Sequence, residues 1–451
     1  MQYRSYALGS QPAWLARYIS SLEFDKEICP YVLDVLRVHV RELAKNGYLD
    51  ERDAREIEEL LEEFDCNERF VGYEDIHEAI EYYLIQRSEA AKQINLGKSR
   101  NDQVATAIRL KTREEILETV DALYLFVKTT YFKARKLRDV FFPTFTHLQP
   151  AQPANLGLYL TSFAEEIVDL IDLFEASLKA TDECPLGAAA AAGSTVELSR
   201  GRRCEELCFR DVALNTLYAT TSRSFLLAST SALLVASLPL LRFAEDMFVF
   251  STPSFGLVKV PDEHAGTSSI MPHKRNPATL EVARAELSKL VGSLTSQFAL
   301  MKGLPSGYCL DLQQLTPLVW ESFSKFRLAT LALADFMEKM EVNEERVKEF
   351  LKYPLQAADV AEFLAKRGVP FRDAYASVAR AVKKHGYDMK LIAEEVLGAE
   401  AEEALKDPVA KRSTPGAPGN LEPVFEKISK GMERMLRILE LRYTYWNCPN
   451  S

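Results

Sequence analysis

The segment FLLASTSALLVASLPLL, residues 225–241, contains no charged side chain and decides the fold class of the chain. It includes serine, threonine and proline, and it is shorter than the roughly 20 apolar residues that a membrane span needs. A helix without charge on any face is typical of the interior of a large helical assembly. We therefore expect a helix that is buried on every side inside a wide bundle.

Helical spacing of apolar residues extends over three further long segments, residues 104–127, 163–178 and 280–298. Strand-like alternation is rare, and its best example, residues 255–260, is too short to build a sheet. Several long helices favour a bundle. We therefore predict an all-α protein with an N-terminal helical domain at 1–97, a central long-helix bundle at 98–349 and a C-terminal helical domain at 350–451.

Composition excludes several classes of partner. Among 451 residues, 65 Asp and Glu outnumber 55 Lys and Arg, which gives a formal net charge of −10. A negative field opposes polyanions, so we expect no nucleic-acid partner and no membrane partner. The first residues lack the apolar core of a signal peptide, which predicts a cytoplasmic protein.

Seven cysteines, an odd number, are spread from Cys29 to Cys448. This pattern is not typical of a disulfide framework and favours thiols in a reducing cytosol. Cys204 and Cys208 are spaced to share a helix face and suggest a metal, but no histidine lies near them in sequence to complete the ligands. We therefore expect buried thiols there and no metal site.

The motif GKSRNDQ, residues 97–103, places Ser99, Arg100 and Asn101 where a helix is expected to begin. Free backbone N–H groups, the positive end of the helix dipole and a guanidinium can converge there on a carboxylate. These residues are candidate substrate-binding groups. A capped helix with a solvated arginine explains the same pattern.

The motif THLQPAQP, residues 146–153, contains His147 next to Thr146. Prolines before and within it predict an extended chain, which fixes where His147 points. Because a histidine with a pKa near 6.5 suits proton transfer at neutral pH, His147 is a candidate acid or base. A purely structural histidine is the alternative.

Two more polar segments precede and follow the last of the predicted helices. GTSSIMPHKRNP, residues 266–277, combines small residues that can close over a ligand with Lys274 and Asn276, and Glu281 follows one turn inside the helix. A coincidental basic loop is the alternative. KGLPSGYCLDLQ, residues 302–313, offers Tyr308 and Gln313 as uncharged hydrogen-bonding groups and is a weak signal alone.

One type of reaction needs this set of groups. Removal of a proton from the carbon next to a carboxylate adds a second negative charge to that carboxylate. The site must therefore supply a base, cationic and N–H donors, and an acid for the leaving nitrogen or oxygen. Ser268, Lys274 with Asn276, and His147 suit these roles, although Ser268 must first be deprotonated by a local positive field.

The combination resembles the fumarase/aspartase superfamily and, within it, the argininosuccinate lyase family. SSIMPHKRNP resembles the superfamily signature, and SRNDQVAT, THLQPAQP and KGLPSGYCLDLQ resemble the argininosuccinate lyase forms. SLEFD at 21–25, EDIH at 74–77 and AKRGVPFRDAY at 365–375 extend the match in family order to about residue 430.

The resemblance implies a homotetramer with one twenty-helix core, and active sites that are each built from three subunits. It implies reversible β-elimination of argininosuccinate to arginine and fumarate, without a metal or organic cofactor. Ser268 then looks like the base, Lys274 with Asn276 like the clamp on the aci-carboxylate, and His147 paired with Glu281 like part of the acid side. The residues that look like substrate contacts are Ser21, Asn101, Thr146, Tyr308 and Gln313.

The chain departs from the family pattern at several positions. Asn95 stands where a histidine is usual, Thr267 where a glycine is usual, and Thr316 where a substrate-binding lysine is usual. MPHKRNP is closer to the form in adenylosuccinate lyases. Another lyase of the superfamily, adenylosuccinate lyase first, and a catalytically idle, crystallin-like structural protein are therefore the alternative functions.

Overall fold

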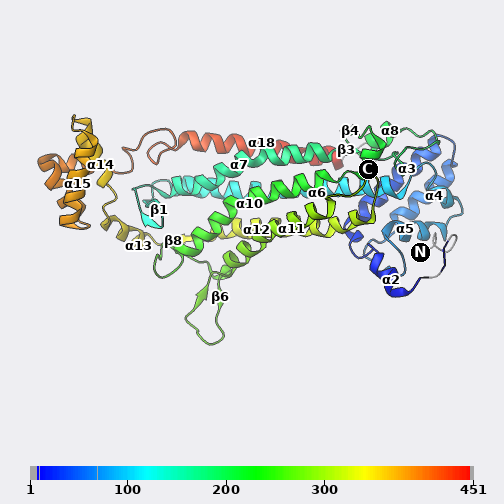
Figure 1. Cartoon of the computed structure of the whole chain (residues 1–451), viewed down its shortest axis with the longest axis horizontal. Coiled ribbons are helices and arrows are strands. Elements are labelled where there is room, and N and C mark those ends of the chain that lie inside the picture. Colours follow the sequence, from blue (N-terminus) through cyan, green and yellow to red (C-terminus); the bar gives the residue numbers. More distant parts are fainter. Residues whose placement is uncertain (1–7, 10, 69, 447–451) are drawn as a thin grey trace.

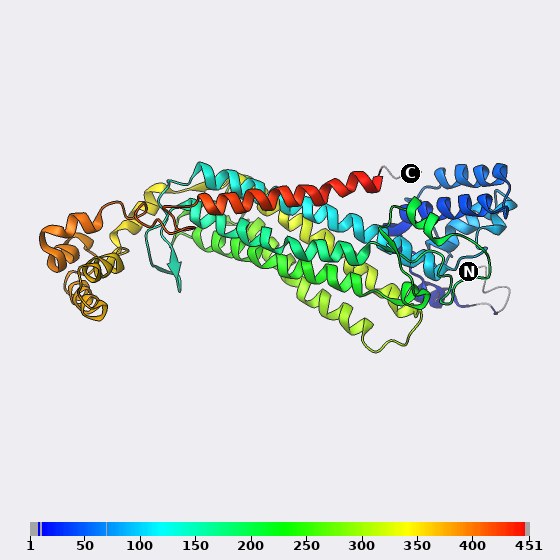
Figure 2. The ribbon, with the colours of Figure 1, turned by 90° about the horizontal axis from the view of Figure 1, so that it is seen from above.

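The computed structural model describes residues 8–9, 11–68 and 70–446, and its fold is all-α (Figure 1). Long helices run side by side and form an elongated bundle, as the second view also shows (Figure 2). They are α6 (Arg100–Lys136), α7 (Leu156–Thr181), α10 (Ser224–Phe250), α11 (Ala278–Met301) and α12 (Leu315–Lys339). A further helix, α18 (Glu422–Trp446), packs along α6 and α7. The predicted all-α class is confirmed.

The bundle is held together by aromatic side chains from facing helices. Phe243 of α10 makes edge-to-face contacts with Phe126 of α6 and Phe163 of α7, each with ring centroids 5.5 Å apart. Phe336 of α12 approaches the same ring at 6.2 Å. Because such rings each bury a large apolar area, this contact fixes how four helices lie against one another.

A group of shorter helices surrounds the end of the bundle where α6 begins (Figure 1). It contains α2 (Ala13–Ile19), α3 (Cys29–Lys45), α4 (Glu51–Glu62), α5 (Ile76–Ile85), α8 (Arg200–Glu206) and α9 (Thr216–Thr221). The parallel pair β3 (Glu183–Cys184) and β4 (Asp211–Val212) joins the segments beside α8. Several chain segments that are distant in sequence therefore meet where α6 starts.

The opposite end of the bundle leads into a small helical module (Figure 1). After α13 (Glu344–Glu349), the module consists of α14 (Ala357–Lys366), α15 (Phe371–His385), α16 (Met389–Leu397) and α17 (Ala401–Leu405). Val360, Val378 and Ile392 belong to a core of its own, distinct from that of the bundle. The chain then returns to the bundle through α18.

The strands are two-residue pairs that shape loops rather than sheets. β1 (Phe145–Thr146) pairs with β2 (Gln149–Pro150), and β6 (Gly266–Thr267) pairs with β7 (Arg275–Asn276), both antiparallel. β5 (Val258–Lys259), within the only strand-like segment that we singled out from the sequence, pairs with β8 (Glu341–Val342). The pairs β1–β2 and β6–β7 lie in connections between bundle helices, and β5–β8 joins such a connection to the segment after α12.

The uncharged segment that decides the fold lies within α10, and a single chain buries it only in part. Only 56% of the most apolar window of this helix is buried, and Leu238 is 52% exposed. Within the described residues, α10 has the length and composition to cross a membrane, a property that core helices share. In the single chain α7, α11 and α12 cover part of α10 and leave an apolar face uncovered.

The expected absence of disulfides is also wrong. Cys29 is bonded to Cys66, and Cys184 to Cys204, with Cα atoms 5.9 and 5.6 Å apart. Cys204 is therefore neither a free thiol nor a metal ligand. The sequence separations of 37 and 20 residues hide the proximity that helix packing creates.

Candidate active site

The start of α6 is fixed by its own side chains and by a distant loop. Ser99 caps the helix in a reciprocal capping box with Asp102. The buried Asp102 carboxylate also accepts hydrogen bonds from the Gly187 and Ala189 N–H groups, both at 2.9 Å. Asn101 donates its side-chain N–H to the Ala190 carbonyl at 3.2 Å. The predicted helix start is therefore present and is pinned to residues 187–190.

Arg100 is directed toward the acidic segment before α5. Its guanidinium donates to Asp75 at 2.8 Å and approaches Glu74 at 3.3 Å. Asp75 also caps α5 by accepting from the Glu78 N–H. Arg100 is thus an ion-paired, half-buried residue rather than the solvated arginine of the alternative interpretation.

Ser21 lies in the same neighbourhood. Its hydroxyl donates to Asp25 at 2.7 Å, and the same carboxylate oxygen accepts from the Ile76 N–H at 3.3 Å. Burial, with the nearby Asp75 charge, raises the pKa of Asp25 to about 7, although the Ser21 hydrogen bond opposes the shift. Ser21 therefore sits beside a carboxyl group that titrates near neutral pH.

Tyr308 and Gln313 complete this cluster from the α11–α12 connection. Gln313 donates to the Ile19 carbonyl at 3.0 Å, two residues before Ser21. Burial and the charges of Asp75 and Asp25 raise the pKa of Tyr308, against the opposing effect of Arg223. We call this group the α6-end cluster, and its members are Ser21, Ser99, Arg100, Asn101, Tyr308 and Gln313.

Thr146 and His147 lie on the other end of the bundle (Figure 1). His147 and Leu148 form a two-residue turn between β1 and β2, with φ of 55° and 57°. The predicted extended chain is wrong at this point, because two left-handed residues close a tight hairpin. The 37 residues of α6 rise about 1.5 Å each, so roughly 55 Å separates this exposed turn from the α6-end cluster.

Ser268 lies in the loop between β6 and β7. Its Oγ accepts from the Met271 N–H at 3.1 Å, and the Ile270 N–H points to the same atom at 3.5 Å. Such amides favour a partial negative charge on a serine oxygen. The loop is otherwise exposed, with Ile270 84% accessible to solvent. Lys274 is exposed in this loop, and Asn276 pairs with Gly266 at its base.

Glu281 occupies the first turn of α11 and lines an open cavity of about 650 Å³ with Arg242, Glu245, Asp246 and Arg284. Among the described residues, no hydrogen bond or ion pair joins it to His147. A single chain therefore holds the predicted residues in separate places: the α6-end cluster, the His147 turn, and the Ser268 loop with Glu281.

Two charged residues near the α6-end cluster were missed as candidates. Lys98 donates to Asn95 at 2.6 Å and to Gln103 at 2.9 Å, and burial lowers its pKa to about 8. Arg223 is only 1% exposed and donates to the Thr220 carbonyl, and burial lowers its pKa to about 10. The sequence signal for Lys98 was its place in GKSRNDQ, which we judged by its other members, and Arg223 lies two residues before the uncharged segment at 225–241 with no motif of its own.

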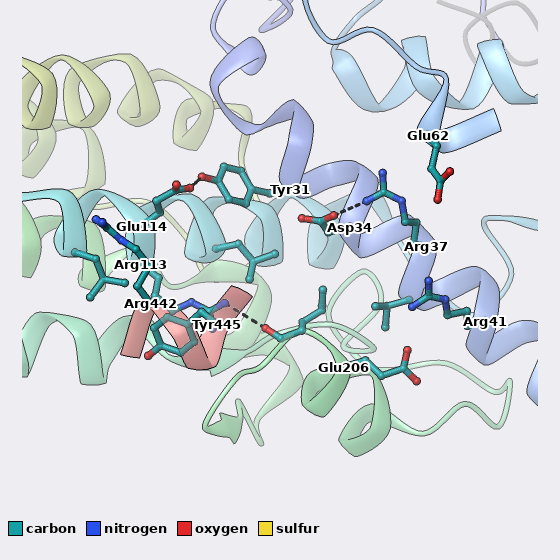
Figure 3. A pocket seen from close by; sticks show the side chains of 14 residues that line it. Tyr31, Asp34, Arg37, Arg41, Glu62, Arg113, Glu114, Glu206, Arg442 and Tyr445 are labelled. Carbon is teal, nitrogen blue, oxygen red and sulfur yellow. Dashed lines mark hydrogen bonds and ion pairs between the residues drawn. The ribbon is translucent and has the colours of Figure 1, made fainter. Parts of the chain in front are cut away.

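Thr316, where the family usually has lysine, is buried and donates to the Gln313 carbonyl at 3.1 Å. It therefore supplies no charge to the site. A different cavity, of about 300 Å³, opens between α3, α6, α8 and α18 (Figure 3). Arginine and acidic side chains line it together, and none of the predicted site residues is among them.

Comparison with known proteins assigns the family. Residues 9–292 match the lyase family, and residues 354–410 match the C-terminal domain of argininosuccinate lyase. The argininosuccinate lyase of Pyrococcus furiosus is 37% identical over 97% of both chains. That of Sulfolobus acidocaldarius is 38% identical over 85% of this chain and 84% of its own.

Solved structures of low identity share the fold. A variant of EDDS lyase with bound fumarate has a TM-score of 0.81 at 22% identity, and covers 98% of this chain and 93% of its own. Class II fumarase from Schistosoma mansoni has a TM-score of 0.74 at 16% identity, with 91% of both chains covered. The argininosuccinate lyase relatives and the match of residues 354–410, not these structures, favour argininosuccinate lyase over the alternatives. The chain is a lyase and belongs to the argininosuccinate lyase family.

Proposed function

We propose that the protein catalyses the reversible β-elimination of argininosuccinate to L-arginine and fumarate, in arginine biosynthesis. The observation that carries this proposal is the 37% identity with an argininosuccinate lyase over 97% of the chain. The C-terminal module adds support, because residues 354–410 match the domain that is specific to that family.

In the proposed mechanism, Ser268 removes the proton from the succinyl carbon next to a carboxylate. The amides of Ile270 and Met271 favour the serine oxyanion that this step requires. The electron pair moves onto the carboxylate, where Lys274 and Asn276 stabilise the added charge. It then returns to form the double bond of fumarate while the carbon–nitrogen bond breaks.

The departing guanidino nitrogen takes up a proton from the acid side, to which we assign His147 with Glu281. The α6-end cluster and Thr146 bind the substrate. Backbone N–H groups at the start of α6 and the Arg100 guanidinium are the groups there that suit a carboxylate. Because Thr316 is uncharged, we assign no lysine contact to this part of the substrate.

We further propose a cytoplasmic homotetramer in which the long helices of four chains form a twenty-helix core. Each active site then takes the α6-end cluster, the His147 turn and the Ser268 loop from three different chains. Two observations support this: the roughly 55 Å that a 37-residue helix spans between two of these places, and the apolar side chains left exposed on the bundle helices. The exposed set includes Leu238 of α10, Val291 and Phe298 of α11, and Leu328 of α12.

The same proposal divides the chain at residues 97 and 349. The separate core of α14–α17 supports an individual C-terminal domain, from which α18 returns to the bundle. Size-exclusion chromatography with light scattering tests the assembly, and a monomer that releases fumarate would contradict the shared site.

The activity itself is tested by incubating purified protein with argininosuccinate and following the ultraviolet absorbance of fumarate. We expect fumarate and arginine in equal amounts. Adenylosuccinate is the matched second substrate, and faster fumarate release from it would favour the alternative lyase. Release from neither substrate by a folded tetramer would indicate an idle structural homologue.

Mixing two inactive variants tests the sharing of sites. We expect His147→Asn and Ser268→Ala tetramers to be inactive alone. When the two are unfolded together and refolded, some sites should receive both intact groups and recover a fraction of wild-type turnover. Mixed tetramers that are proven by mass spectrometry but remain inactive would overturn the composite site.

A further inference from the structure

A buried histidine stands at the base of the Ser268 loop. His264 ends the short 3-10 helix Asp262–His264, two residues before β6, and is only 7% exposed. Its Nδ1 lies 3.0 Å from the Thr279 hydroxyl, and its Nε2 lies 2.9 Å from the Asp335 carboxylate. Its ring packs edge-on against Phe336, with ring centroids 5.3 Å apart.

The partners of His264 belong to two different helices, α11 and α12. Thr279 is in the first turn of α11, directly after the strand β7 that ends the loop. Asp335 is on α12, where Lys339 holds its carboxylate at 3.0 Å. One imidazole therefore joins the incoming side of the loop to its outgoing side and to the bundle.

The remaining attachments of the loop are few among the described residues. β6 pairs with β7 through Gly266 and Asn276, and Arg275 forms an ion pair with Asp262 on the surface. Between these contacts the loop is exposed. The direction of Ser268 therefore depends on where the two ends of the loop are held, and an error near 1 Å in such a group can cost about 100-fold in rate.

We propose that His264 is a positioning residue for the Ser268 loop, which it holds against α11 and α12 so that the serine oxygen faces the substrate. This inference rests on the proposed role of Ser268 as the base. Neutral imidazole satisfies both contacts, with Nε2–H donating to Asp335 and Nδ1 accepting from the Thr279 hydroxyl.

Three variants of His264 separate its two contacts. His264→Gln carries an amide N–H near the position of Nε2 and keeps the contact with Asp335. His264→Asn places its amide near the position of Nδ1 and keeps the contact with Thr279. His264→Ala removes both. We expect kcat to fall about 10- to 100-fold in the alanine variant, with KM changed less than threefold, and each amide variant to recover part of the loss.

The attachment of the loop can also be measured by proteolysis, without following the reaction. Trypsin cleaves after exposed lysine and arginine residues, so the rate of cleavage after Lys274 or Arg275 reports how often the loop leaves its place. We expect His264→Ala to be cleaved several times faster than wild type, and Thr279→Val to be intermediate. This measurement stands even where argininosuccinate is not the substrate, so failure of the proposed function and failure of this inference are distinguishable.

A matched control excludes general destabilisation. Leu333→Ala removes a fully buried side chain from the same helix as Asp335. We expect it to lower the melting temperature while kcat and the cleavage of the loop stay near wild type well below melting. Unchanged kcat and unchanged cleavage in His264→Ala would overturn the proposal, and so would an equal loss of kcat in Leu333→Ala.

Discussion

The α6-end cluster and the hairpins that carry His147 and Ser268 are built in opposite ways. The cluster is held by helix caps, ion pairs and buried carboxylates, and Asp102, which fixes the start of α6 beside it, is 0% exposed. The hairpins are exposed, and Ile270 beside Ser268 is 84% accessible. One chain therefore preforms the α6-end cluster, whereas Ser268 and His147, the groups that we assign to proton transfer, stand on short exposed loops. Substitutions around the α6-end cluster should therefore mainly change stability, and substitutions in the hairpins should mainly change turnover.

The largest expected effect is on turnover, from the Ser268 loop. Ser268→Ala should lower kcat at least 10³-fold, which corresponds to about 4 kcal/mol of activation free energy, because it removes the group that we assign as the base. The melting temperature should stay within about 1 °C, since the side chain is not in the core. Fumarate release and calorimetry measure both effects, with Ser269→Ala as the matched control. A melting temperature that falls together with kcat would contradict the distinction between the two regions.

Among the described residues, a disulfide bond stabilises the surroundings of the α6-end cluster but not the two hairpins. The Cys184–Cys204 bond closes a segment of 20 residues that includes Gly187 and Ala189, the donors to Asp102. Loop-closure entropy gives it about 3 kcal/mol of stabilisation. Cys184→Ser should lower the free energy of unfolding by that amount, while kcat at low temperature stays near wild type. Dithiothreitol should lower it further, because it also reduces the Cys29–Cys66 bond. The Ser268 loop should be insensitive to reductant, and loss of kcat before unfolding would contradict this.

The sequence predicts helices and motifs better than it predicts where motifs meet. The periodicity at 104–127, 163–178 and 280–298 lies within α6, α7 and α11, because an amphipathic stripe is a local property. The cysteine pairs were mispredicted, because they depend on which helices become neighbours. The His147 turn was mispredicted because φ values of 55° and 57° are unusual for residues other than glycine.

Replacement of Asp102 tests the preformed region directly. Asp102→Asn replaces an acceptor of three backbone N–H groups, those of Ser99, Gly187 and Ala189, with an amide that accepts at only one end. An unsatisfied buried group costs about 1–3 kcal/mol, so the free energy of unfolding should fall by about 2 kcal/mol. Urea unfolding measures it, with the exposed Asp262→Asn as control. Because Asn101 begins the same helix, KM should also rise, in contrast to the kcat effect at Ser268.

The smallest expected effect is the pH dependence of stability that Asp25, beside Ser21, contributes. Asp25 has a folded pKa of about 7, above the ordinary value of 3.8, because it is buried. Between these values the folded chain holds a proton that the unfolded chain has released, so stability falls as pH rises from about 4 to 7. The site can relax when the carboxyl ionises, so the change in the free energy of unfolding is smaller than a rigid site would give. We expect a change of about 1–2 kcal/mol between pH 5 and pH 7. Asp25→Asn should remove this contribution to the slope, since an amide does not titrate, and the exposed Asp50→Asn is the control for general charge effects. Urea unfolding at pH 5 and pH 7 measures this change. If the free energy of unfolding varies equally with pH in wild type and Asp25→Asn, the carboxyl beside Ser21 is already ionised at pH 5. This region is then less enclosed than its hydrogen bonds indicate.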